Sequence, residues 1–247
     1  MSLMLSEKMR RHVAQEHKIN PFSTYLQEIV YGGNDGIITT FAVVAGFNGA
    51  SQNPLSTLPV LAVLIFGFAN LFADSMSMGL GNFLSLRSEQ GRYRALKEKE
   101  LLEIRNNPSA EKEETIDILT SRGFTKQDAQ VITSFYSKNE DYWAEFMMKY
   151  ELEMATPLLE NPYLTGLATI LAFMFFGFIP LTPYLFLSIN QSTFILSTIF
   201  AFAAMIVLGL IRWRVTKDSI IRSVGEIVFV GGIAAVIAYF VGSFFKA

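Results

Sequence analysis

The sequence contains no cysteine and little charge. The missing cysteines exclude a disulfide framework, a thiolate zinc site, an iron–sulfur cluster and a cysteine nucleophile. Charged residues make up 17% of the 247 residues, against about 25% in an ordinary soluble domain. Twenty basic and 22 acidic residues leave a net charge of −2, so there is no positive surplus to neutralise a phosphate backbone. We therefore expect no nucleic-acid partner.

Histidine is also scarce. The two histidines, His12 and His17, both lie in the N-terminal arm, so a metal site in the rest of the chain must use carboxylates, thioethers, amides and carbonyls. No Walker loop, no dinucleotide-binding G-x-G-x-x-G and no histidine-containing catalytic set occurs. The sequence therefore favours a protein that is not an enzyme.

Long apolar runs are what the sequence does have. Residues 36–73, 161–211 and 227–245 contain no Asp, Glu, Lys or Arg, and a transmembrane helix needs about 20 apolar residues. A soluble helical bundle would need polar faces that these runs lack. Because polar patches divide the two longer runs, the pattern predicts five transmembrane helices near residues 28–48, 57–86, 163–187, 193–211 and 224–245.

The basic residues predict the orientation of these helices. The N-terminal arm, residues 87–162 and the loop 212–223 hold 19 of the 20 Lys and Arg residues, and only Lys246 lies on the other side. Since basic residues concentrate on the cytoplasmic side of membranes, we expect a cytosolic N-terminus and a C-terminus on the opposite side. The polar, charged first 27 residues predict no signal peptide.

The fold class predicted is thus an all-α integral membrane protein, with a small cytosolic helical domain between spans two and three. The expected parts are an N-terminal arm (1–27), spans one and two (28–86), the cytosolic domain (87–162) and spans three to five (163–247). Within the cytosolic domain we expect a continuation of span two over 87–104, a stop at 106–109 with Ser109 opening a new helix that Gly123 ends, and helices over 125–136 and 142–154.

The first span carries Asp35 among Gly32, Gly33 and Gly36. A carboxylate inside a span costs about 2.5–3.5 kcal/mol on insertion scales, so it usually faces a partner, a cavity or an ion path. Glycines at this point let another helix, or a hydrated ion, come close to the backbone. Glu28 lies on the same helical face. The alternative is that these carboxylates reach interfacial water near the helix start.

In the second span Asn70, Asp74 and Met78 recur at intervals of four and form one polar and thioether stripe. Methionine beside carboxylates suits a transition metal better than calcium or magnesium, although methionine in an apolar helix is usually core filler. Near the last span, Glu226 follows Arg222 by one turn. An i,i+4 ion pair explains it adequately.

The segment 87–162 contains two acidic pairs spaced i,i+3, Glu100 with Glu103 and Glu111 with Glu114. Met147, Met148 and Glu151 follow on another helix. Such pairs are most often a solvated helix face. However, positions 98–117 contain seven acidic residues and only three basic ones. So many like charges repel one another unless a cation binds between them.

Four separated motifs together resemble the vacuolar iron transporter family. They are N-D-G-I-I-T-T-F-A-V-V-A-G-F at 34–47, S-M-G-L-G-N-F-L at 77–84, E-x-x-E-I-x-x-x-P-x-x-E-x-x-E at 100–114 and F-M-M-K-Y-E-L at 146–152. The resemblance covers nearly the whole chain from about residue 16. It implies a homodimer of five-span protomers, with an ion path at the dimer interface and Fe(II) leaving the cytosol in exchange for protons.

The resemblance also assigns residues. Asp35 and Met78 match the carboxylate and thioether that line the path, and Glu28 and Glu226 match acidic positions in the first and last spans. The metal ligands of the family's cytosolic domain correspond to Glu100, Glu103, Glu111, Glu114, Met147, Met148 and Glu151. Plant members have a Glu two turns before the path methionine, where this sequence has Asn70, and Asp74 is the candidate replacement.

Two functions of different class follow. The first is a divalent-metal transporter for Fe(II), with Mn(II), Co(II) and Zn(II) as further candidate ions, antiported against protons. The second is a membrane-anchored cytosolic protein that binds and buffers metal without transporting it. The intramembrane Asp35, Asp74 and Met78 favour transport, because an anchor does not need them. The expected location is the cytoplasmic membrane in a prokaryote or a vacuolar or other organellar membrane in a eukaryote.

Overall fold

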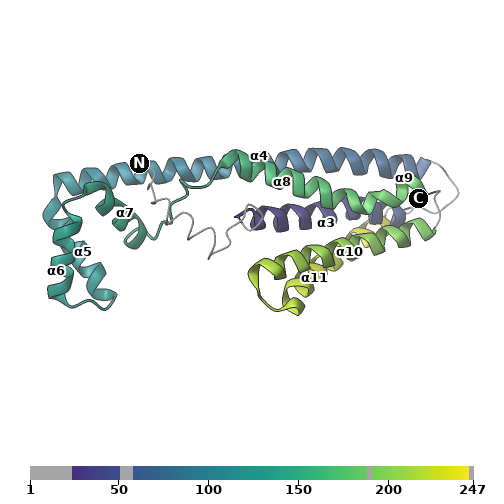
Figure 1. Cartoon of the computed structure of the whole chain (residues 1–247). Coiled ribbons are helices and arrows are strands. Elements are labelled where there is room, and N and C mark those ends of the chain that lie inside the picture. Colours follow the sequence, from purple (N-terminus) through teal and green to yellow (C-terminus); the bar gives the residue numbers. More distant parts are fainter. Residues whose placement is uncertain (1–23, 51–57, 188–190, 245–247) are drawn as a thin grey trace, which may run out of the picture. The chain divides into compact units, whose positions relative to one another are not determined.

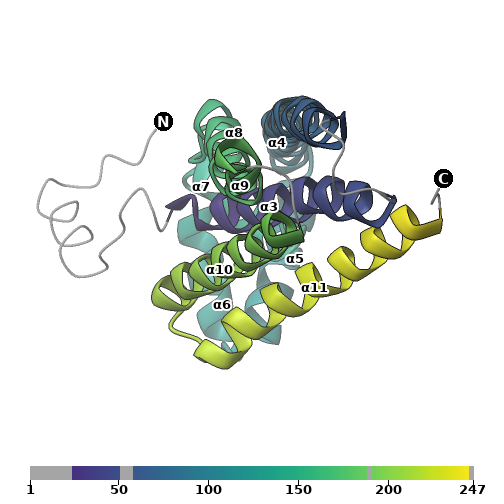
Figure 2. The same cartoon turned by 90° about the vertical axis from the view of Figure 1, so that its right-hand side faces the viewer.

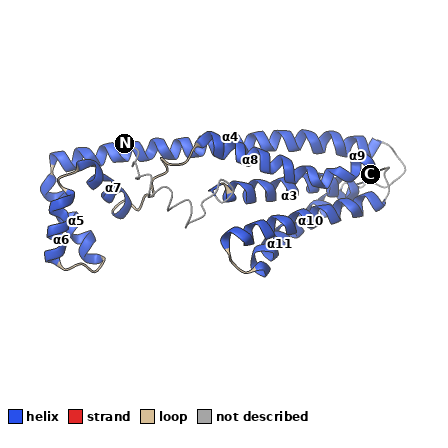
Figure 3. Cartoon of the chain, in the orientation of Figure 1, coloured by secondary structure: helices blue, strands red, loops and turns tan. Residues whose placement is uncertain are grey.

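A computed structural model describes residues 24–50, 58–187 and 191–244. Over these residues the chain is helical, with no strand (Figure 3). His12 and His17 lie outside the described residues. The chain divides into two compact units, one comprising Met1–Asn82 and Tyr163–Ala247 and the other Phe83–Pro162.

The first unit is a bundle of long apolar helices. It contains α3 (Leu26–Ala50), the first part of α4 (Leu58–Asn106), α8 (Pro162–Phe178), the 3-10 turn η1 (Ile179–Leu181), α9 (Thr182–Phe186), α10 (Gln191–Thr216) and α11 (Ile220–Phe244). Helix α3 lies between α8 and the pair α10–α11 (Figures 1 and 2). Its residues Ile37, Phe41 and Val44 pack with Phe173 and Leu208 in the core.

Four helices of the described chain are long and apolar enough to cross a membrane: Leu61–Asn106, Pro162–Phe186, Ser192–Thr216 and Ile220–Phe244. The prediction of a multi-pass helical membrane protein is therefore confirmed. Helix α3 has 25 residues, about 37 Å at 1.5 Å per residue, which is also sufficient length. Because Glu28, Asn34 and Asp35 lower its hydropathy, α3 is not among the four, and the fifth span stays a prediction.

The third predicted span is not one uninterrupted α-helix. Helix α8 ends at Phe178, and the turn η1 and the short α9 follow, with Pro180 and Pro183 each near the start of a new element. Proline has no N–H to donate and clashes with the preceding turn, so it interrupts an α-helix. Helices α10 and α11 also extend past the predicted ends, because a charged side chain marks the edge of an apolar run but does not end a helix.

Close helix packing accounts for the glycines around Asp35. A Cβ on Gly32 would lie 2.9 Å from the backbone oxygen of Thr169 in α8, and one on Gly36 would clash with the backbone oxygen of Phe173. Of the two alternatives for these glycines, a hydrated ion or a neighbouring helix, the structure shows the helix. Asp35 therefore flanks the face of α3 that packs on α8.

The second unit contains the last part of α4 with α5 (Pro108–Ser121), α6 (Lys126–Tyr136) and α7 (Glu140–Tyr150). Its core is built around Trp143, which is 1% exposed and whose Nε1 donates a 2.7 Å hydrogen bond to Thr115 Oγ1. Ion pairs of 2.8 Å join Lys97 to Glu145 and Arg105 to Glu140, and they attach α4 to α7.

The predicted ends of these helices are partly correct. Helix α4 continues past the apolar run as predicted, to Asn106 and not 104, and the helix predicted over 125–136 is α6, for which Thr125 is the N-cap. Helix α5, however, begins at Pro108 and not at Ser109, since proline is favoured in the first turn of a helix. Helix α7 spans 140–150 and not 142–154, because Asn139 caps its start and Glu153 adopts a positive φ of 52° beyond its end.

Candidate metal-binding sites

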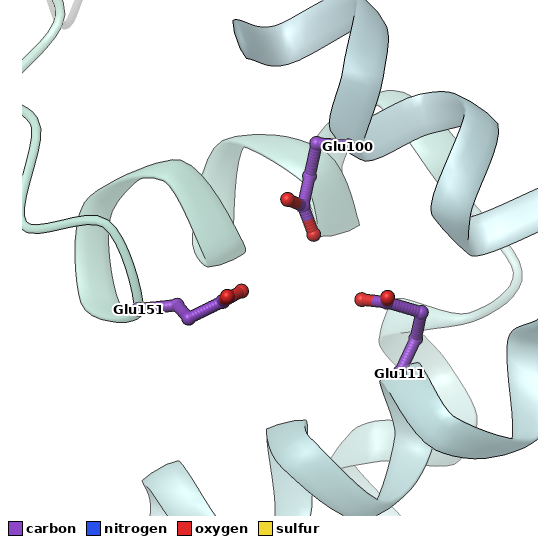
Figure 4. Close-up of side chains that lie close together, drawn as sticks. All are labelled: Glu100, Glu111 and Glu151. Atoms are coloured by element: carbon purple, nitrogen blue, oxygen red, sulfur yellow. The ribbon is translucent and has the colours of Figure 1, made fainter.

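Three of the predicted glutamates converge in the second unit. Glu100 of α4, Glu111 of α5 and Glu151 at the end of α7 each direct a carboxylate oxygen to one point, and these oxygens all lie within 4.8 Å of one another (Figure 4). Glu100 is 3% exposed and Glu111 is 6% exposed, whereas Glu151 opens to solvent. The arrangement offers oxygen ligands from three helices to one cation.

The electrostatics of this cluster are unfavourable without a cation. Burial, together with repulsion from Glu151 and Glu111, raises the pKa of Glu100 to about 8. Burial also raises the pKa values of Glu111 and Glu151. Glu100 Oε1 and Glu111 Oε2 are buried and have no hydrogen-bond partner among the described residues. Buried carboxylates either protonate or find a positive partner, and a divalent ion supplies that partner.

Glu103 and Glu114 lie at the rim of the cluster. Their negative charges both contribute to the raised pKa of Glu151. Glu103 forms a 3.2 Å ion pair with Lys99 on its own helix, and Glu114 is exposed. The structure thus brings all five predicted glutamates into one region, hereafter the acidic cluster. Glu100, Glu111 and Glu151 converge at its centre, and Glu103 and Glu114 lie at its edge. Among these glutamates, the exposed Glu114 fits the alternative interpretation of a solvated helix face.

The two predicted methionines of this unit are fully buried. Met147 Sδ lies 3.4 Å from Thr115 Oγ1, and that hydroxyl donates a 2.7 Å hydrogen bond to the backbone oxygen of Glu111. Met147 therefore lies beside the α5 wall of the cluster, but it also packs with Trp143 in the apolar core. A soft sulfur ligand next to hard oxygens suits a transition metal. Met148 is buried without a described contact to the cluster.

In the first unit, Asp35 of α3 and Asp74 of α4 are both half-buried and lie close enough for their charges to interact. A groove of about 600 Å³ is lined by Asn70 and Ala73 of α4 and by Ala42, Val43 and Gly46 of α3, and neither aspartate is among its lining residues. Two carboxylates from different helices thus interact, and the groove reaches Ala73, the residue before Asp74.

The other predicted membrane residues lie as follows. Met78 is half-buried and packs against the apolar core of the bundle. Asn70, Asp74 and Met78 are all half-buried, so their stripe lies at the edge of the buried face of α4. Glu28 is half-buried in the first turn of α3.

The predicted ion pair of Glu226 with Arg222 is wrong. Glu226 Oε2 accepts a 2.7 Å hydrogen bond from Arg212 Nη1 in α10, and Arg222 lies 3.5 Å from Asp218. The tight connection between α10 and α11 places the end of one helix against the start of the next. Arg212 was not among the predicted residues, although its position as the first charge after a run of 51 uncharged residues could have identified it.

Comparisons with known proteins agree with this architecture. The VIT family matches residues 26–243. The vacuolar iron transporter of Toxoplasma gondii is 32% identical over 238 residues, covering 93% of this chain and 77% of that protein. Vacuolar iron transporter 1 of Tulipa gesneriana is 30% identical over 230 residues, and the match covers 92% of this chain and 91% of that protein. Vacuolar iron transporter 1 of Arabidopsis thaliana is 30% identical, with coverages of 87% and 83%.

Proposed function

Because the chain belongs to the VIT family, we propose that it transports Fe(II) out of the cytosol across a membrane in exchange for protons. Mn(II) is the next candidate substrate, followed by Co(II) and Zn(II), since mixed oxygen and thioether ligands accept several divalent transition metals. The five-span topology, with α3 as the first span and the unit 83–162 in the cytosol, is part of this proposal.

The proposal of transport rests on the pair of carboxylates Asp35 and Asp74. Carboxylates inside a membrane bundle are costly and are found where an ion or proton moves. These two come from different helices and interact electrostatically, and the groove at Asn70 reaches Ala73, the residue before Asp74. Together they can hold a divalent ion stripped of part of its water, and they can accept protons once the ion has left.

The ion path is proposed to lie between two protomers. Asp35 lies one turn after Tyr31, which is 58% exposed, so at Tyr31 this face of α3 is left open by the helices that the structure describes. A second copy packed on it would bring two sets of Asp35, Asp74 and Met78 together around one path. Isologous contacts of this kind are the commonest way to form a homodimer.

The acidic cluster is proposed to collect metal on the cytosolic side. Its buried, unpartnered oxygens bind a cation in competition with protons, because metal ligands must be deprotonated. The same cluster would serve a buffering protein equally well. Only the membrane carboxylates distinguish the two functions.

Reconstitution separates transport from buffering. The purified chain is placed in liposomes that enclose a dye quenched by Fe(II), with protein-free liposomes as the control. A transporter quenches the dye progressively and well beyond the amount of metal that the protein itself can bind. A buffering protein binds Fe(II), as equilibrium dialysis would show, but leaves the enclosed dye unquenched.

A further inference from the structure

Two buried side chains lie one helical turn away from the carboxylates of the acidic cluster. Thr115 of α5 follows Glu111 by four residues, and Met147 of α7 precedes Glu151 by four. A spacing of four keeps two side chains on one helix face, about 6 Å apart along the axis. Thr115 and Met147 are both fully buried, and their Oγ1 and Sδ atoms lie 3.4 Å apart. Hence α5 and α7, which converge at the cluster (Figure 4), also meet one turn beneath it.

The Thr115 hydroxyl links these two helices. It has one hydrogen, and the backbone oxygen of Glu111, at 2.7 Å, is a closer acceptor for it than the sulfur. The hydroxyl oxygen in turn accepts a 2.7 Å hydrogen bond from Nε1 of Trp143 on α7. The sulfur of Met147 therefore receives no hydrogen bond from Thr115, and its lone pairs stay available to a metal ion.

We propose that Thr115 is a positioning residue, which holds the sulfur of Met147 as a ligand for the ion in the acidic cluster and so makes the cluster prefer Fe(II) to Mn(II). This inference rests on the metal-collecting role proposed above for that cluster. Manganese prefers oxygen ligands, whereas a thioether adds affinity for the softer Fe(II).

Loss of the Thr115 hydroxyl would release the indole of Trp143. A buried N–H without an acceptor is unfavourable, and Met147 Sδ borders the position that the hydroxyl oxygen occupies. The indole would then donate to the sulfur and compete with the ion for its lone pairs. Partners that orient a metal ligand in this way typically contribute about 10- to 100-fold to metal affinity.

Quenching of Trp143 fluorescence measures metal binding at this place in the full chain. The background is Trp213→Phe, which leaves Trp143 as the single tryptophan. Fe(II), kept reduced without oxygen, and Mn(II) are titrated separately at one pH, and the readout is the ratio of the Mn(II) to the Fe(II) dissociation constant. With Thr115 intact, this ratio should exceed one. Thr115→Val removes the hydroxyl and keeps the branched shape, so it should weaken Fe(II) binding about tenfold and Mn(II) binding less.

Two further variants separate the hydroxyl from packing. Thr115→Ser keeps the hydroxyl and removes a methyl group, so it should keep the ratio, whereas a role in packing alone would make it the worse of the two Thr115 variants. Met147→Leu conserves volume and should lower the ratio as far as Thr115→Val does. Combining Met147→Leu with Thr115→Val should lower it no further, because both changes act on one contact.

Thr133→Val is the matched control. Thr133 is also buried, and its hydroxyl also donates to the backbone oxygen four residues earlier, at 2.8 Å. It belongs to α6, which contributes no residue to the acidic cluster. Thr133→Val should therefore keep the ratio seen with Thr115 intact.

The outcomes distinguish this inference from the function on which it rests. Binding of both ions with an unchanged ratio in Thr115→Val would overturn the inference and leave the metal-collecting role standing. The same holds for an unchanged ratio in Met147→Leu, which decides on its own if Thr115→Val does not fold, and for a loss in Thr115→Ser equal to that in Thr115→Val. If neither ion quenches Trp143 with Thr115 intact, metal collection by the cluster is overturned, and the inference with it.

Discussion

At the scale of single residues, burial decides how the acidic cluster behaves. Glu100 is almost fully buried beside two other carboxylates, so its charged form is disfavoured. A proton relieves the repulsion at low pH and a metal ion relieves it at higher pH. Protons and metal therefore compete for the same oxygens, which is the behaviour expected of a site that must also release its ion.

The raised pKa of Glu100 predicts a stability that depends on pH. Its ordinary pKa of 4.5 rises to about 8 on folding, so the folded state binds the extra proton between these values. The stabilisation is complete below about pH 4.5 and is lost as the pH rises through about 8. Fe(II) or Mn(II) should restore stability at the upper end. Fluorescence-monitored unfolding of Trp213→Phe, which leaves Trp143 of this unit as the single tryptophan, would measure it.

Glu100→Gln is the informative variant for that measurement. It removes the titrating group and keeps the volume, so the metal-free protein should lose most of its pH dependence between about 4.5 and 8. A slope equal to that of wild type would show that Glu100 titrates normally in the folded protein.

The acidic cluster should bind metal jointly. Because several carboxylates share the charge of one ion, a single change among the rim residues should weaken binding only in part. Changing Glu100, Glu103, Glu111 and Glu114 together to Gln should abolish it. Calorimetric titration of the full chain with Mn(II) measures this, and Glu113→Gln, an exposed neighbour on α5, is the matched control. Undiminished binding by the fourfold variant would reject the assignment.

The sequence could predict which glutamates share a helix face but not which are buried. The i,i+3 spacing treats Glu111 and Glu114 alike, whereas the structure buries the first and exposes the second. The difference arises from packing of α5 against α4 and α7, which no local pattern contains. Glu226 illustrates the same limit, because its partner Arg212 lies on another helix.

At the scale of helices, the crossing of α3 and α8 fixes the position of Asp35. Gly36 lies against the backbone at Phe173, and Gly177 of α8 lies in turn against Gly36. This contact fixes the rotation of α3 and thereby the direction of Asp35, which lies beside Gly36. The glycine pattern predicted a close approach, and the structure identifies α8 as the neighbour.

Gly36→Ala should therefore destabilise the bundle. The added methyl group would clash with backbone, and overpacking of this kind costs about 1–3 kcal/mol. Gly81→Ala is the control, because nothing lies within 4 Å of its added methyl and alanine favours a helix by up to about 1 kcal/mol. Thermal unfolding in detergent compares them. Equal melting temperatures for the two variants would contradict the packing described.

Asp74 is predicted to replace the acid that is absent at Asn70. A shift of four residues moves a side chain about 6 Å along a helix with little rotation, and both positions are half-buried on the same edge of α4. Asp74→Asn should impair uptake of Fe(II) into liposomes and weaken its pH dependence, and adding Asn70→Glu should partly restore both. Wild-type transport by Asp74→Asn across the neutral pH range would show that α4 needs no acid.

At the scale of the whole molecule, the segregation of charge predicted the long apolar helices. Uncharged runs identified four helices that meet the length and hydropathy of a membrane span, and the charged segment between them forms a unit of its own. Interruptions such as the one at Pro180 were missed because hydropathy reports burial in lipid and not backbone continuity. The same polar residues that lower the hydropathy of α3 are those proposed to move the ion.

The central claim is that Asp35 carries metal through the membrane, and Asp35→Asn tests it most directly. This change removes the negative charge, keeps the volume and leaves the acidic cluster intact. Initial rates of Fe(II) entry into dye-loaded liposomes are compared with wild type, after confirming that the variant has the same oligomeric mass and binds Fe(II) in detergent. We predict retained binding and loss of uptake to the level of protein-free liposomes. Uptake by Asp35→Asn at the wild-type rate would contradict the account.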